Sequence, residues 1–151
     1  MFNLSKLKVL VPLDGSEKSM HSLDWLKKFF GKEELEITLI NVIEVVYGGE
    51  MIPVNFENME IAYIGGIVPV NFEKISSRIL DVAEKELDGY KVNKLSIWGY
   101  SSDVILKEAS EGKYDMIVMT KSSVKGISRI IGSVTNKVVR NSEVAVVVVP
   151  E

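Results

Sequence analysis

The chain has 151 residues, of which 46% are hydrophobic and 26% are charged, and its formal net charge is −3. These values are typical of one globular domain, which we expect to span residues 1–151, and the small negative charge argues against a protein that binds nucleic acid by neutralising phosphates. The chain contains no cysteine, which excludes disulfides, thiol catalysis and cysteine-ligated metals.

The first part of the chain alternates between apolar runs and amphipathic segments. Lys6–Leu13 is a short apolar run that predicts a first, central strand. A helix capped by Asp14 or Ser16 is expected to follow it and to run to about Phe30. Leu35–Glu44 alternates at first and becomes apolar later, which predicts a second strand.

The segment at about 47–71 is irregular and forms an insertion between predicted elements. The residues Pro-Val-Asn-Phe-Glu at 53–57 recur at 69–73, and a Gly-Gly pair and a tyrosine precede each copy. A loop of this length is usually functional, mobile or part of an interface. The alternative is a local duplication in a loop that tolerates change.

The second part of the chain continues the alternation of helices and strands, with glycines at several boundaries. Helical spacing of apolar residues and runs of β-branched residues distinguish the two types of element. In order, we expect a helix over Phe72–Leu87, a strand over Lys94–Trp98, a helix capped by Ser101 or Ser102, a strand over Tyr114–Met119, a helix over Ser133–Asn141 and a strand over Val144–Val149.

This order predicts an α/β fold: an open, doubly wound, five-stranded parallel sheet with helices on both faces. Ligands of such sheets bind beyond the carboxyl ends of the strands, so Asp14, Val42, Gly99 and the loop 120–132 are candidates for a pocket. Gly132 and Ser133 open the last helix, whose first N–H groups offer a seat for an anion. Ser133 and Thr135 are expected to cap this helix and, secondarily, to bind phosphate.

Six fragments, taken in their order and spacing, resemble one known family. They are Val-Leu-Val-Pro-Leu-Asp-Gly-Ser at 9–16, Leu-Ile-Asn-Val at 39–42, Gly99 with Ser-Asp-Val-Ile at 102–105, Asp-Met-Ile-Val-Met at 115–119, Gly-Ser-Val-Thr at 132–135 and Val-Val-Val-Val-Pro at 146–150. The chain is similar to the universal stress proteins over nearly its whole length. The resemblance implies a flavodoxin-like, adenine nucleotide alpha hydrolase-like domain that serves the stress response and dimerises, often through its last strand.

One branch of that family binds ATP through a Gly-x-x-Gly-x9-Gly-Ser/Thr pattern after strand four, and another branch lacks the pattern and binds no nucleotide. Gly132-Ser133 matches its third element, but Thr120 and Ser123 replace the first two glycines, and the interval after Ser123 is one residue short. A left-handed φ at the β-branched Thr120 would cost roughly 1–2 kcal/mol of conformational energy. The resemblance implies that ATP, with magnesium, would contact Pro12, Asp14, Val42, Met119, Thr120, Ser123, Gly132, Ser133, Val134 and Thr135.

No set of catalytic or metal-ligating residues is recognisable. Ser16 stands where haloacid-dehalogenase phosphatases carry a second aspartate, and neither a Gly-x-Ser-x-Gly elbow nor a Walker loop is present. His21 is the only histidine, so the sequence supports no zinc site. No signal peptide is recognisable and no apolar run approaches the roughly 20 residues of a membrane span, so we expect a cytoplasmic protein.

Two functions from different classes therefore remain open. The first is a module that holds an adenine nucleotide without catalysis, or with slow hydrolysis, and signals through a change of shape or partner. The second is a nucleotide-free interaction protein whose degenerate phosphate loop has become structural. Both would be homodimers, because the charge-free run Val144–Val149 needs a cover if it lies at the edge of the sheet.

Overall fold

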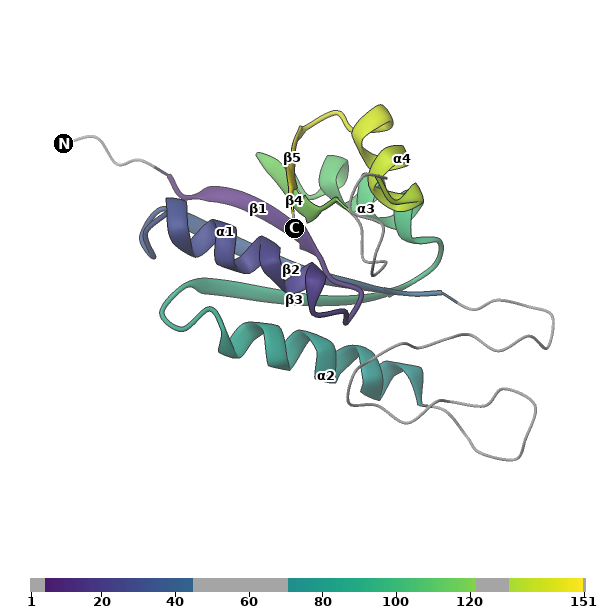
Figure 1. Ribbon diagram of the computed structural model, residues 1–151, viewed down its shortest axis with the longest axis horizontal. Coiled ribbons are helices and arrows are strands. Elements are labelled where there is room, and N and C mark those ends of the chain that lie inside the picture. Colours follow the sequence, from purple (N-terminus) through teal and green to yellow (C-terminus); the bar gives the residue numbers. More distant parts are fainter. Residues whose placement is uncertain (1–4, 45–70, 122–130, 151) are drawn as a thin grey trace.

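The structure is a computed structural model that describes residues 5–44, 71–121 and 131–150. Within these ranges all the expected elements are present (Figure 1). The expected insertion at 47–71, apart from Asn71, and the candidate site residue Ser123 lie outside the described residues. The strands are β1 (Leu7–Pro12), β2 (Leu35–Ile43), β3 (Lys91–Trp98), β4 (Met116–Thr120) and β5 (Ala145–Val149), and the helices are α1 (His21–Phe29), α2 (Phe72–Lys85), α3 (Ser101–Glu111) and α4 (Ser133–Asn141).

The five strands form one parallel sheet in the order β3-β2-β1-β4-β5, so β1 occupies the centre, as expected. The fold class predicted from the sequence is thereby confirmed. Dinucleotide-binding sheets contain this order, whereas flavodoxin itself has the order 2-1-3-4-5, with β1 beside β3. The winding reverses between β1 and β4, because the chain first builds outward to β3 and then returns across the sheet.

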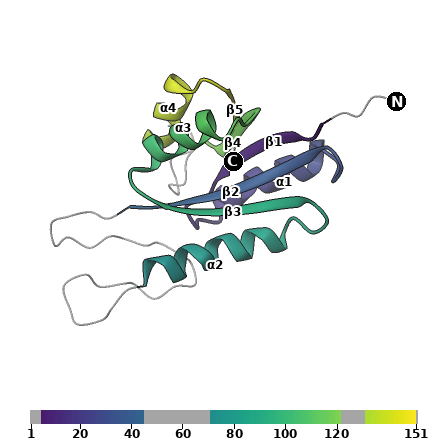
Figure 2. The same ribbon diagram turned by 180° about the vertical axis from the view of Figure 1, so that it is seen from behind.

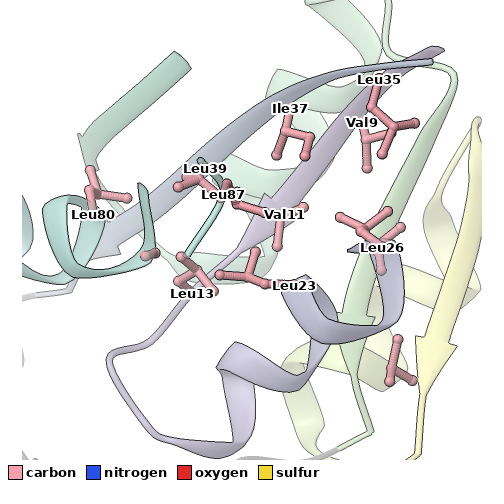
Figure 3. Packing of buried hydrophobic residues seen from close by; sticks show 13 residues of the cluster. Val9, Val11, Leu13, Leu23, Leu26, Leu35, Ile37, Leu39, Leu80 and Leu87 are labelled. Atoms are coloured by element: carbon pink, nitrogen blue, oxygen red, sulfur yellow. The ribbon is translucent and has the colours of Figure 1, made fainter. Parts of the chain in front are cut away.

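Two helices cover each face of the sheet (Figures 1 and 2). Right-handed crossovers place α1 and α2 on one face and, after the reversal, α3 and α4 on the other. Each face has its own apolar core. Leu23 and Leu26 of α1 pack with Val9 and Val11 of β1 on the first face (Figure 3). Ile105 of α3 and Val138 of α4 pack with Leu10, Ile40 and Ile117 on the second face.

The central strands are buried on both faces, as expected for parallel strands that read as continuous apolar runs. Val9, Leu10 and Val11 have no exposed surface, and neither do Leu39 and Ile40 of the adjacent strand. Burying an aliphatic side chain of this size contributes roughly 1.5–3 kcal/mol. This core fixes the carboxyl ends of β1 and β2, from which the candidate site residues project.

The two edges of the sheet differ in character. At one edge, β5 consists of one alanine and four valines. At the other edge, β3 carries Lys91, Asn93 and Lys94, all of which are exposed. Lys91 pairs with Glu36 at 3.2 Å, and Lys94 pairs with Asp81 at 2.9 Å.

The first turn of α3 is capped by a residue distant in the sequence. We expected Ser101 or Ser102 to cap this helix, but the structure shows no side-chain cap from the N-cap residue, Tyr100. Instead, the carboxylate of Glu44, which follows β2, accepts a hydrogen bond from the backbone N–H of Ser101. The expectation was wrong because the cap comes from a neighbouring strand end, which local spacing cannot reveal.

Replacing Glu44 with alanine should therefore weaken α3. Loss of a capping side chain typically lowers the free energy of unfolding by about 0.5–2 kcal/mol. Urea denaturation followed by circular dichroism would measure the change. Glu44→Gln, which keeps an acceptor oxygen, serves as the control and should lose less than Glu44→Ala; equal stability of both variants and the original protein would contradict the assigned cap.

Candidate functional site

All carboxyl ends of a parallel sheet lie at one edge, and here that edge brings most of the sequence-predicted site residues together. Pro12 ends β1, Val42 lies near the end of β2, and Thr120 ends β4. Because β1 and β4 are neighbours on either side of the reversal in winding, their ends form the switch point at which doubly wound folds bind ligands. The helix α4 comes after β4 in the chain, so its first residues also belong to this edge.

The turn after β1 presents an exposed carboxylate. Oδ1 of Asp14 accepts a hydrogen bond from the Ser16 N–H at 2.8 Å, and Gly15 adopts a left-handed φ of 86° between them. Oγ of Ser16 accepts from the Ser19 N–H at 3.2 Å, at the start of a short 3-10 turn, η1 (Lys18–Met20). Ser16 thus caps the helical segment that η1 and α1 form together, as expected, although α1 itself begins only at His21 and has no side-chain cap from its own N-cap residue, Met20.

One face of the sheet carries three of the predicted contact residues. Ile40 belongs to the core beneath α3 and α4, and its cross-strand partner is Pro12. Val42, two positions further along β2, packs half-buried against the same core, and Met119 of β4 is buried in it. Since side chains alternate between faces, Pro12, Val42 and Met119 lie on the α3/α4 side of the carboxyl edge.

The ladder between β1 and β2 stops just short of this edge. The last paired residues are Pro12 and Ile40, and the Leu13 N–H donates to the Ile40 carbonyl at 2.9 Å. The next rung would join the Val42 N–H to the Leu13 carbonyl, but that carbonyl accepts the side-chain amide of Asn41 at 2.8 Å instead. The main-chain N–H of Val42 therefore projects past the end of β1 without this ladder partner.

Asn41 is the residue of this region that the sequence reasoning did not single out. Its side chain is buried, with 6% of its surface exposed. The signal was present in the sequence, since one amide interrupts the apolar second half of β2, at 39–43. A buried amide is expected to have a hydrogen-bond partner.

The N-cap residue of α4 provides no side-chain cap. Gly132 occupies the N-cap position, and the first helical hydrogen bond runs from the Asn136 N–H to the Gly132 carbonyl at 2.9 Å. Ser133 does not cap the helix, and the hydroxyl of Thr135 donates to the Thr120 carbonyl at 3.0 Å. The expected caps at Ser133 and Thr135 are therefore wrong, since Ser133 is the first residue of the helix and the Thr135 hydroxyl is directed to β4.

Thr120 does not adopt the left-handed φ that a phosphate-loop glycine would permit, as expected of a β-branched residue. It is the last residue of β4, lies opposite Val149 in the ladder and is buried. Left-handed φ is confined, among the described residues other than glycine, to Lys113. Thr120 therefore adopts the extended geometry that a β-branched residue favours.

The helices that start at this edge differ in how their first turns are satisfied. The side chain of Asn71 accepts from the Lys74 N–H at the start of α2, and Glu44 serves α3. Among the residues that the structure describes, which do not include 122–130, no such side chain bonds the start of α4. Unsatisfied N–H groups and the helix dipole make this end attractive to an anion.

Among the described residues, the titratable groups with displaced pKa values are Tyr114, Glu36 and Lys94, and none of them belongs to this edge. Burial raises the pKa of Tyr114, and the hydrogen bond from Lys91 lowers the pKa of Glu36. Both residues lie at the amino ends of strands, since Tyr114 precedes β4 and Glu36 is the second residue of β2. Across the described ranges, no three His, Asp or Glu side chains gather as metal ligands, and no helix is long and apolar enough to cross a membrane.

One protein-family model matches nearly the whole chain. The model of the universal stress protein family matches residues 7–150. The chain belongs to the universal stress protein family. A comparison with curated proteins gave no match.

Solved universal stress proteins share the fold over almost the whole chain. A universal stress protein in complex with cAMP has a TM-score of 0.66 and 20% identity, with 97% of this chain and 98% of the other covered. A family protein from Arabidopsis thaliana with AMP bound has a TM-score of 0.66 and 18% identity, covering 95% and 90% of the two chains. The protein UspA from Lactobacillus plantarum has a TM-score of 0.62 and 15% identity, covering 97% and 99%.

Proposed function

We propose that this universal stress protein is a cytoplasmic regulatory module that binds an adenine nucleotide without catalysis at the carboxyl edge of its sheet. The observation that carries the proposal is the start of α4, which has no side-chain cap among the described residues, follows β4 and thus adjoins the switch point beside β1. A phosphate group there would accept hydrogen bonds from the first N–H groups of the helix and from the hydroxyl of Ser133.

The nucleoside would extend from α4 toward β1 and β2. The exposed carboxylate of Asp14 can accept hydrogen bonds from ribose hydroxyls. The Val42 N–H is a donor for a ring nitrogen of adenine, and the half-buried Val42 side chain offers the base an apolar surface. Two solved relatives hold AMP and cAMP, which supports an adenine nucleotide as the ligand class.

The phosphate-binding contribution of Thr135 is limited to its backbone. A hydroxyl has one hydrogen to donate, and that of Thr135 is directed to the Thr120 carbonyl at 3.0 Å. A phosphate anion requires donors, and the Gly132 N–H is directed to the Lys121 carbonyl at 2.9 Å. Ser133 and Val134 therefore remain the principal donors at this end, and Gly132 contributes close approach of the backbone without a side chain. The family resemblance implies one further contact residue, Ser123. It also implies that the nucleotide is ATP with a magnesium ion.

A specific observation favours the alternative, a nucleotide-free interaction protein. Thr120, at the position of the first glycine in the ATP-binding pattern, is 8% exposed and paired within the sheet. The main chain at Thr120 thus continues strand β4, whereas a glycine cradle presents backbone to the phosphates.

Isothermal titration calorimetry separates the two functions. With AMP, cAMP and magnesium ATP as ligands, we expect at least one dissociation constant on the order of micromolar. GMP serves as the control for the base and should bind more weakly. The absence of heat with all three adenine nucleotides, combined with no nucleotide in native mass spectra of the freshly purified protein, would reject the first function in favour of the second.

Homodimerisation through β5 is part of the same proposal. The β5 strand is an edge strand without a charged side chain. Exposed apolar edges invite pairing with another strand, and a second copy across a two-fold axis provides a closed solution.

A proline at Val148 should break this dimer while leaving the sheet intact. The Val149 carbonyl accepts from the Lys121 N–H, on the β4 side, so the adjacent Val148 directs its N–H outward. Val148→Pro removes that outward donor without removing a bond to β4. We expect sedimentation velocity at micromolar concentration to show a monomer for Val148→Pro and a dimer for the control, Val148→Thr; a dimer in both cases would place the interface elsewhere.

A further inference from the structure

We propose that Asn41 is a positioning residue that holds the Asp14 turn for nucleotide binding. The inference rests on the proposed function, because Asp14 is the expected ribose contact. Asn41 itself is buried and lies on the face opposite Val42, so it acts through the backbone that it bonds. Its side-chain amide donates to the carbonyl of Leu13, the residue immediately before Asp14.

This hydrogen bond takes the place of a ladder bond. A regular parallel ladder would continue from Leu13 to the backbone N–H of Val42 and would carry the chain straight on past Asp14. With the carbonyl satisfied by a side chain, β1 ends at Pro12 and the chain is free to turn at Gly15, where φ is 86°. Asn41 thus fixes the peptide that precedes Asp14 without using the Val42 N–H.

The bond also spans the two elements that would contact the nucleoside. It joins residues 28 positions apart, one at the end of β1 and the other beside Val42 in β2. Leu13 is buried and packs beneath α1 and α2, whereas the next residue, Asp14, is exposed. The side chain of Leu13 therefore anchors the peptide that leads to the exposed carboxylate. Loss of the amide would leave a buried carbonyl unpaired and release the turn toward solvent.

Amide hydrogen exchange of the nucleotide-free protein tests the positioning directly. In Asn41→Leu, which removes the donor, we expect exchange at the Ser16 and Ser19 amides to accelerate by about tenfold. Asn41→Asp, which keeps the size of the side chain but not its N–H groups, is a second variant. Thr38→Val alters another buried polar residue of β2 and serves as the control, with no change expected at those amides.

Titration with AMP tests the consequence for binding. We expect Asn41→Leu to raise the AMP dissociation constant by about tenfold in the original chain, but less than about twofold in an Asp14→Ala background. Non-additivity of this kind is expected only if Asn41 acts through Asp14, whereas general destabilisation would weaken binding equally in both backgrounds.

The outcomes separate this inference from the proposed function. Unchanged exchange at Ser16 and Ser19 in both Asn41 variants overturns the positioning role, and so do equal effects in the two backgrounds. If the original protein binds no AMP, the proposed function fails, while the exchange measurement still decides whether Asn41 holds the Asp14 turn.

Discussion

Replacing Leu10 with alanine is expected to lower the free energy of unfolding by about 2–5 kcal/mol. Leu10 lies in the central strand β1, has no exposed surface and packs with Ile40 and Ile117 beneath α3 and α4. The shortened side chain would leave a cavity in the middle of the sheet, where neighbouring strands prevent collapse. Urea denaturation followed by circular dichroism measures the loss.

The matched control is Val139→Ala on α4. Val139 is 47% exposed, so its truncation should change the free energy of unfolding by no more than about 0.5 kcal/mol. A loss at Leu10 as small as that at Val139 would contradict the assignment of β1 to the centre of the sheet. Because Asp14 follows this strand, the same experiment tests the platform on which the proposed site rests.

Replacing Gly132 with aspartate is expected to have opposite effects on stability and on nucleotide binding. Gly132 is the N-cap residue of α4 and has a φ of −59°, which any L-residue can adopt. An aspartate there would cap the helix and stabilise the fold by up to about 1 kcal/mol. Its carboxylate would occupy the N–H groups proposed for phosphate and repel the ligand, weakening AMP binding by about ten- to a hundredfold.

Gly132→Ala is the control, since it adds a side chain without an acceptor. AMP should bind Gly132→Ala much more tightly than Gly132→Asp, and calorimetry on both variants measures the difference. Equal affinities would exclude the start of α4 as the phosphate site. A stability gain in Gly132→Asp without loss of affinity would indicate that the ligand binds elsewhere on the sheet edge.

The sheet was predictable from the sequence because its signal is local. Buried parallel strands read as apolar runs, and right-handed crossovers restrict how such runs can be connected. The central position of β1 and the pairs of helices on each face follow from these rules. Bringing Pro12, Asp14, Val42 and Met119 to one edge required no more information than the direction of the strands.

The ends of α3 and α4 were not predictable, because their partners are distant in the sequence. Glu44 caps α3 across 57 residues, and the Thr135 hydroxyl bonds the end of β4 rather than its own helix. Asn41 escaped notice for a similar reason, since its partner is the carbonyl of Leu13 in another strand. Local spacing identifies where a helix can begin, whereas the fold decides which side chain satisfies it.

The unequal borders of the sheet also limit how copies of this chain can accumulate. Strand addition at β3 would disturb lysines engaged with carboxylates, and the bonds with Asp81 and Glu84 raise the pKa of Lys94, which favours its charged form. Only the β5 border offers an uncharged strand to a second copy. If copies pair through β5 as proposed, association ends after two chains, and we expect this architecture to resist growth into fibres.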